Sequence, residues 1–119
     1  MSASKQVRFD DRGDVMIIDL SEWDGNPASI QDSEQELAER DRNANYAGYV
    51  TDLGGVSLSK ETQRHIAESW SSLIEELNGD QFAYVSEGIE AMAATAQIQS
   101  NDNVETFESV TEAIDWIRG

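Results

Sequence analysis

"YAGYVTDLGGVSLSKETQRHIAESWSSLIEELNGDQFAYVS", residues 46–86, holds two strand-like segments around a helix-like one. Both ends of the stretch are rich in aromatic and β-branched residues, which is typical of strands. Between them, apolar residues recur at helical spacing, at Ile66, Trp70, Leu73, Ile74 and Leu77. A strand, a helix and a strand in this order form a right-handed crossover, so the two strands are expected to lie parallel. The stretch therefore predicts an α/β fold.

The flanking sequence extends this pattern in both directions. Toward the N-terminus, "KQVRF" and "DVMIIDL" are separated by "DDRG" and predict an antiparallel hairpin, which makes the sheet mixed. Beyond the hairpin, the sequence predicts a helix at residues 30–43. After residue 86 it predicts a helix at residues 87–99, a short strand at 104–109 and a final helix at 109–119. The first of these has a thin apolar face made of Ile30, Leu37 and Ala38. We expect a single domain over residues 1–119, with a mixed sheet of about five strands covered by about four helices.

The charge balance is the strongest signal in the composition. The chain has 24 Asp and Glu residues against 8 Lys and Arg, which gives a formal net charge of −16. Nucleic acid and anionic membrane surfaces are unexpected partners, because both attract basic rather than acidic proteins. Scarce lysine with surplus carboxylate is typical of proteins from extreme halophiles, since concentrated salt screens the repulsion between carboxylates.

The absence of cysteine excludes disulfides, thiolate zinc sites and cysteine nucleophiles. It fits a reducing compartment. The sequence also has no apolar run near the roughly 20 residues that cross a bilayer, and the polar start "MSASKQVRFDD" lacks the apolar segment of a secretory signal. We therefore expect a cytoplasmic protein.

The chain starts with a hairpin, and three later segments complete a recognisable pattern. They are the turn "VTDLGGVSLS", the strand and helix "FAYVSEGIEAMAA", and the ending "VETFESVTEAIDWI". Their combination resembles the STAS-like domains, the family named for sulfate transporters and anti-sigma-factor antagonists. The ending is the most characteristic part, because it joins a short strand with an aromatic residue to a helix that holds "EAIDW". The resemblance spans most of the chain and implies a STAS-like fold and a regulatory role exerted through protein contact, such as that of an anti-sigma-factor antagonist.

The resemblance also points to particular residues. In regulatory members of the family, an aspartate ends a strand, and a serine at the start of the next helix is phosphorylated to switch binding to an anti-sigma factor. This implies such roles for Asp52 and for Ser57 or Ser59, although the family's Asp-Ser-x-Gly pattern is absent here. The favoured interpretation of Ser59 is a helix N-cap, because it precedes Lys60 and Glu61 at the expected helix start, where a cap contributes about 1 kcal/mol.

The same turn is a candidate anion site. Gly54 and Gly55 precede the expected helix start, where backbone N–H groups attract anions. The spacing matches neither the Walker motif nor the G-x-G-x-x-G fingerprint, so a nucleotide is not expected. An alternative function is therefore the binding of a small apolar or anionic ligand between the helices and the sheet, at the turn over residues 52–60.

No residue pattern predicts a catalytic centre. Ser57 and Lys60 have the S-x-x-K spacing of serine acyl-enzymes but lack the K-T-G partner motif. His65, the single histidine, is expected in solvent on the helix face opposite Ile66 and Trp70. We expect no enzymatic activity, no cofactor and no metal site.

Trp23 is a candidate anchor for a partner, because it lies beside the loop "DGNP". The favoured alternative is a core position, since aromatic side chains bury large areas. The sequence as a whole predicts a small cytoplasmic domain that binds a protein partner and binds neither nucleic acid nor membrane. A homodimer is compatible with it.

Overall fold

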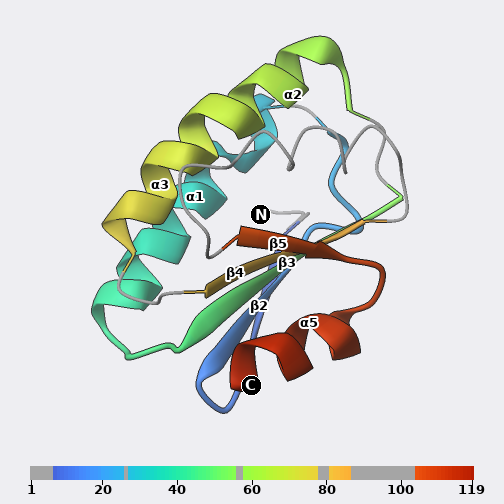
Figure 1. The fold of residues 1–119 in the computed structure, drawn as a ribbon. Coiled ribbons are helices and arrows are strands. Elements are labelled where there is room, and N and C mark those ends of the chain that lie inside the picture. Colours follow the sequence, from blue (N-terminus) through green and yellow to red (C-terminus); the bar gives the residue numbers. More distant parts are fainter. Residues whose placement is uncertain (1–6, 26, 56–57, 78–80, 87–103) are drawn as a thin grey trace.

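A computed structural model describes residues 7–25, 27–55, 58–77, 81–86 and 104–119 of the chain (Figure 1). These residues form a five-stranded sheet in the order β1-β2-β3-β4-β5. The strands are β1 (Arg8–Arg12), β2 (Val15–Asp19), β3 (Gly48–Gly54), β4 (Gln81–Ser86) and β5 (Val104–Phe107). β1 runs antiparallel to β2, and every later pair is parallel. The mixed five-stranded sheet expected from the sequence is thus confirmed.

The N-terminal hairpin is confirmed, but its turn is shorter than expected. The sequence assigned "DDRG" to the turn, whereas β1 continues through Arg12, which pairs with Val15. Gly13 allows this tight reversal, because its backbone has a φ of 66°, a conformation that glycine adopts without steric cost. The charged residues before the turn are exposed on an edge strand, so pairing does not bury them.

Helices cover both faces of the sheet (Figure 1). On one face lie α1 (Pro27–Arg42) and a continuous helix over residues 60–76, which consists of α2 (Lys60–His65), the π-helical segment η1 (Ile66–Trp70) and α3 (Ser71–Glu76). On the other face lies α5 (Val110–Arg118). Because β2, β3 and β4 are consecutive parallel neighbours, right-handed crossovers place both connecting helices on one face. We call the continuous helix α2–α3.

The helices expected at residues 30–43 and 109–119, and the helix expected between the two strands of residues 46–86, are therefore confirmed, and the two predicted ranges agree with the structure within one turn at their ends. The helix expected at residues 87–99 lies outside the described residues. The described part of the chain contains no helix long and apolar enough to cross a bilayer.

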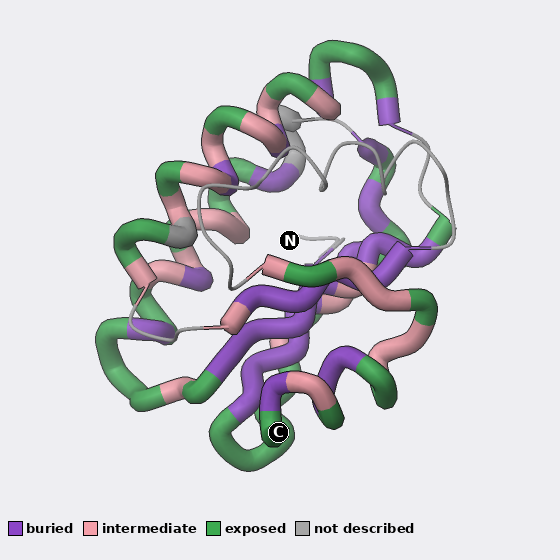
Figure 2. Tube along the Cα trace, viewed as in Figure 1, coloured by how far each residue is buried: buried purple, intermediate pink, exposed green. Residues whose placement is uncertain are grey.

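Each face of the sheet has its own core. The α1 face carries a large cluster rich in aromatic residues, which includes Trp23, Tyr49, Trp70, Phe82 and Tyr84. The α5 face carries a smaller, aliphatic cluster made of Val15, Ile17, Val50, Ala83, Val85, Ala113, Ile114 and Ile117. Figure 2 shows the buried residues running along β2, β3 and β4, while β1 and β5 at the edges are more exposed. The alternation of side chains along the central strands supplies both clusters.

Candidate functional site

The predicted turn begins at the carboxyl ends of β2 and β3, where the two strand ends are tied together. The Leu20 N–H donates to the Asp52 carbonyl at 2.7 Å. The Asp52 carboxylate accepts from the Gly54 N–H at 3.0 Å, and the Asp19 carboxylate accepts from the Ser21 N–H at 2.9 Å. We call residues 19–21 and 52–55 the carboxyl rim. Its backbone is fixed, because side chains satisfy the backbone donors that the strands leave unpaired.

Two glycines give the carboxyl rim its shape. Gly54 has a φ of 56°, and a Cβ at this position would lie 3.1 Å from the Ser21 Cβ. Gly55 is exposed, and a Cβ there would meet nothing within 4 Å. The first glycine is therefore needed for the turn and for the contact with the β2 end, whereas the second faces open space.

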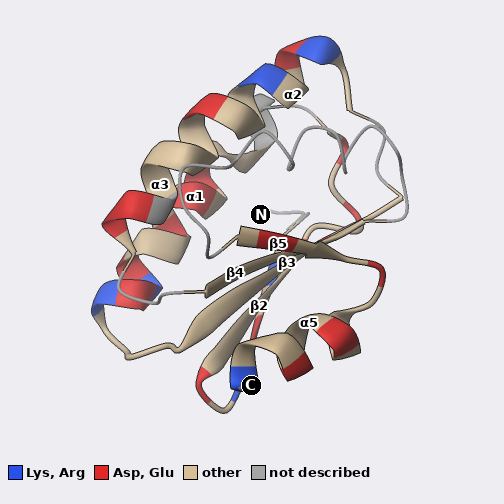
Figure 3. Ribbon diagram, in the orientation of Figure 1, with Lys and Arg blue, Asp and Glu red and all other residues tan. Residues whose placement is uncertain are grey.

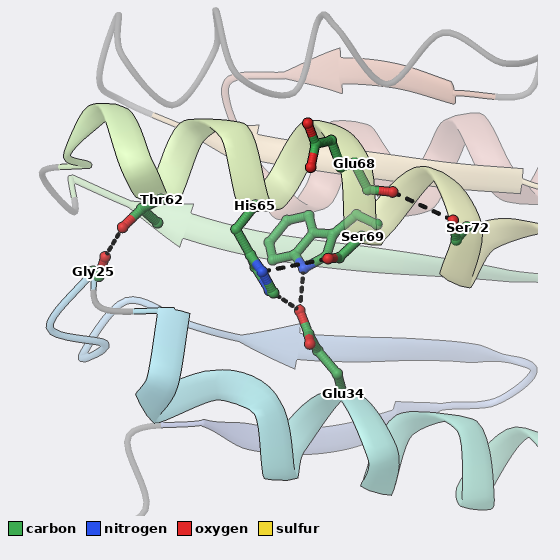
Figure 4. A network of polar contacts seen from close by, with 8 residues as sticks. Gly25, Glu34, Thr62, His65, Glu68, Ser69 and Ser72 are labelled. Atoms are coloured by element: carbon green, nitrogen blue, oxygen red, sulfur yellow. Dashed lines mark hydrogen bonds and ion pairs between the residues drawn. The ribbon is translucent and has the colours of Figure 1, made fainter.

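Ser59 is the N-cap of α2, as the sequence predicted. Its hydroxyl accepts from the Thr62 N–H at 3.2 Å, and its backbone is extended. Thr62 is buried and donates through its own hydroxyl to the Gly25 carbonyl, which ties the helix start to the loop after β2 (Figure 4). Ser57 lies outside the described residues.

Trp23 is part of the core, with only 3 % of its surface exposed. It belongs to the aromatic cluster of the α1 face. The core interpretation is thus confirmed, and a side chain buried to this extent offers no surface to a partner.

His65 is not in solvent, so that prediction is wrong. Its Nε2 lies 2.8 Å from Glu34 Oε2, and the same carboxylate oxygen accepts from Trp70 Nε1 at 2.6 Å. The side chains of His65 and Glu34 are 17 % and 19 % exposed. In Figure 4, Glu34 reaches up from α1 toward His65, so this network joins α1 to the α2–α3 helix.

The π-helical segment explains the error. In a regular α-helix of 3.6 residues per turn, residues five apart point in different directions. The i→i+5 turn of η1 accommodates one extra residue, which brings His65 and Trp70 toward the same side. Both can then reach Glu34. A helical pattern with constant spacing cannot show this local change of register.

Ser69, His65 and Glu34 resemble a serine, histidine and acid triad in their order of contacts. Ser69 Oγ lies 3.3 Å from His65 Nδ1. Nucleophilic catalysis also needs N–H donors directed at the developing oxyanion. Ser69 is inside η1, in the middle of a continuous helix, where backbone N–H groups bond within the helix. The arrangement therefore holds the two helices together but does not offer an oxyanion hole.

A cavity lies between the sheet and the two helices of the α1 face. Its volume is about 40 Å³, and the space reaches about 480 Å³ only when it is counted out into the solvent at the open mouth. Most of its wall is apolar, from β2, α1 and α3, and four aromatic rings line it: Tyr49, Trp70, Phe82 and Tyr84. Three polar residues also reach it, Ser33, Glu34 and Thr51. Leu20 of the carboxyl rim lines the cavity, whereas no described residue between 52 and 60 does.

Two buried hydroxyl groups line the cavity without a partner. Thr51 and Tyr84 are 9 % and 5 % exposed, and neither side chain makes a hydrogen bond to another described residue. Fully enclosed side-chain N and O atoms of the described residues all have partners, so these two hydroxyls open onto the cavity. Burial raises the pKa of Tyr84, because the phenolate would lose its hydration.

A sequence signal for part of this site exists. Ile30, Glu34 and Leu37 lie at helical spacing, so a carboxylate occupies the apolar stripe of α1. A charged residue on such a stripe indicates a buried partner in the fold. Thr51 and Tyr84 carry no such signal, since polar and aromatic residues are common in strands.

The described residues contain no group of three or more His, Asp or Glu side chains placed to hold a metal ion. No family model, curated protein or solved structure matches the chain.

Proposed function

We propose that the chain is a STAS-like, non-catalytic interaction domain that binds a protein partner through its carboxyl rim and the start of α2. The observation that carries this proposal is the combination of an exposed surface with a fixed backbone. Ser21, Gly55 and Ser59 are exposed, yet hydrogen bonds hold the segments on which they lie. A surface ordered before binding loses little conformational entropy when a partner docks.

The positions of Asp52 and Ser59 support the STAS-like part of the proposal. Asp52 is in the last part of β3, and Ser59 begins the helix that follows. These are the places that the family's regulatory aspartate and serine occupy. The capping role of Ser59 does not conflict with modification, because a phosphate at a helix N-terminus is stabilised by the helix dipole.

The charge near the carboxyl rim favours a basic partner. Glu22, Asp24 and Glu61 are exposed there, and Asp19 and Asp52 are half-buried. Figure 3 shows acidic residues along the helices and in the loops as well, in line with the net charge of −16. Complementary charge on the partner raises the association rate and excludes acidic competitors.

Gly55→Arg tests the docking surface without disturbing the fold, since a side chain at Gly55 enters open space. Glu39→Gln is the matched control, because it makes the same change in net charge at an exposed position on α1. Tagged wild-type protein and both variants are used for affinity capture at molar KCl, with quantitative mass spectrometry and melting temperatures. We expect all three to melt alike and Gly55→Arg alone to lose specific partners. Equal partner sets for Gly55→Arg and wild type would contradict the proposed surface.

The non-catalytic part of the proposal has its own test. Ester hydrolysis is measured with wild type and Ser69→Ala, because Ser69 contacts His65. We expect the two proteins to have the same activity as buffer. Hydrolysis that disappears in Ser69→Ala would show that the proposal is wrong.

The proposal includes a halophilic setting. Raising KCl from about 0.1 M to about 1 M shortens the screening length from about 10 Å to about 3 Å, which weakens repulsion among the carboxylates. We expect the melting temperature to rise over this range. A melting temperature that does not change with salt would contradict the halophilic interpretation.

A further inference from the structure

We propose that Thr62 is a positioning residue of the docking surface: its buried hydroxyl holds the loop over residues 21–25 against the start of α2. The inference rests on the proposed function, because it concerns the same surface. It adds a residue that a partner does not touch, since Thr62 is fully buried.

The docking surface combines two segments that are far apart in the sequence. The loop after β2 contributes the exposed side chains of Glu22 and Asp24, and the start of α2 contributes that of Glu61. A partner that contacts both segments requires a fixed distance between them. The hydrogen bond from the Thr62 hydroxyl to the Gly25 carbonyl joins the two segments directly (Figure 4).

The direction of each hydrogen bond at Thr62 follows from its single hydroxyl proton. The Gly25 carbonyl can only accept, so the Thr62 hydroxyl donates to it. Ser59 Oγ lies 3.0 Å from Thr62 Oγ1 and therefore donates to it, while the same Ser59 oxygen accepts from the Thr62 N–H at 3.2 Å. The two hydroxyls and the carbonyl thus form one chain of hydrogen bonds, which leads from the helix start to the loop.

Burial makes this link hard to replace. Thr62 has 0 % of its surface exposed and Gly25 is buried, so water has little access to the carbonyl if the hydroxyl is removed. A buried carbonyl without a donor is costly, and the loop escapes that cost by moving toward solvent. Ser21, at the other end of the loop, is held independently, because its N–H donates to the Asp19 carboxylate.

The place of Thr62 on the helix supports a role for its hydroxyl. Thr62 and Ile66 are four residues apart and both fully buried, so they share the inward face of the helix. A hydroxyl on such a face is unfavourable unless it is hydrogen-bonded. The bonds to Gly25 and Ser59 meet this requirement, and they distinguish threonine from a valine of the same shape.

Thr62→Val and Thr62→Ser separate the hydroxyl from the shape of the side chain. Valine keeps the branched shape and lacks the hydroxyl, whereas serine keeps the hydroxyl and lacks the methyl group. Backbone NMR relaxation of the full chain in molar KCl measures the order parameters of Gly25 and Ser21. In Thr62→Val, we expect that of Gly25 to fall from about 0.85 to below about 0.6, with no change at Ser21. In Thr62→Ser, both should match wild type.

Ser59→Ala is the matched control, because it removes the helix cap and leaves the bond between Thr62 and Gly25 in place. Gly25 should stay rigid in this variant. Three results would overturn the proposal: a rigid Gly25 in Thr62→Val, a mobile Gly25 in Thr62→Ser, or a mobile Gly25 in Ser59→Ala. So would a Thr62→Val protein that does not fold, because the hydroxyl would then serve the whole fold rather than the loop.

Affinity capture in molar KCl relates the link to partner binding. We expect Thr62→Val to recover about 5-fold less of the partners that Gly55→Arg loses, and Thr62→Ser to retain them. If Gly55→Arg loses partners that Thr62→Val captures like wild type, the role of Thr62 is wrong and the docking surface stands. If Gly55→Arg loses none, the docking surface itself is wrong, and the positioning role falls with it.

Discussion

The two faces of the sheet are packed differently. On the α5 face, a nine-residue helix covers small aliphatic side chains of β2, β3 and β4. On the α1 face, two longer helices cover large aromatic side chains and enclose a cavity, with Glu34, His65 and Trp70 joined between the helices. One face is closed and apolar, whereas the other has space and polar groups. The difference indicates that close packing stabilises the α5 face, whereas the α1 face keeps unfilled space beside polar side chains.

Close packing on the α5 face is visible at Gly48. A Cβ there would lie 2.8 Å from the Gln81 carbonyl oxygen and 2.8 Å from Ile117 Cγ2. The helix therefore lies directly on the backbone of β3. No larger residue fits at this crossing without a shift of the helix or strand.

The largest expected effect compares truncations on the two faces. Ile117→Ala removes a buried side chain from the closed face, and we expect it to lower the free energy of unfolding by about 3 kcal/mol. Leu73→Ala truncates a partly buried side chain beside the existing cavity and should cost about 1 kcal/mol. Denaturant unfolding in molar KCl measures both. Equal losses would contradict the difference in packing.

Adding atoms gives the reverse comparison, with a smaller effect. Gly48→Ala forces a methyl group against Gln81 and Ile117, and we expect a loss of about 2 kcal/mol. Thr51→Val exchanges an unpaired hydroxyl for a methyl group beside the cavity, so stability should stay equal or rise. The same unfolding experiments apply. A destabilised Thr51→Val protein would show that this hydroxyl has a partner in the folded state.

The smallest expected effect concerns the caps of the helices. Ser59 caps α2 and Ser109 caps α5, each accepting a backbone N–H bond at 3.2 Å. Ser59→Ala and Ser109→Ala should each cost about 1 kcal/mol. Because the geometry is the same on both faces, we expect similar values. A loss from Ser59→Ala near zero would remove the capping role and leave modification as the explanation for this serine.

Much of the fold could be predicted from the sequence because it depends on local periodicity. The spacing of Ile66, Trp70 and Leu73 indicated a helix, and "QFAYVS" matches β4 residue for residue. Ser59 was recognised as a cap because capping involves neighbours in the chain. These features need no knowledge of distant segments.

The site was less predictable because it depends on contacts between distant segments. The prediction that His65 lies in solvent is wrong because a π turn changes the helical register. No residue in "IAESW" indicates such a turn. The cavity depends on how the sheet, α1 and the α2–α3 helix pack together. The spacing of residues within one of these elements does not determine that packing. Glu34 is the residue of the site that the sequence does indicate, because it lies on the apolar stripe of α1 between Ile30 and Leu37.

Xenon binding followed by methyl NMR tests the central claim that the two faces differ in unfilled space. Xenon enters apolar cavities and needs no polar recognition, so it reports on space alone. We predict that xenon shifts the methyl signals of Ile18, Leu37 and Leu73 on the α1 face and leaves those of Val50, Ile114 and Ile117 on the α5 face unchanged. Shifts of similar size on both faces, or no shift on the α1 face, would contradict the account.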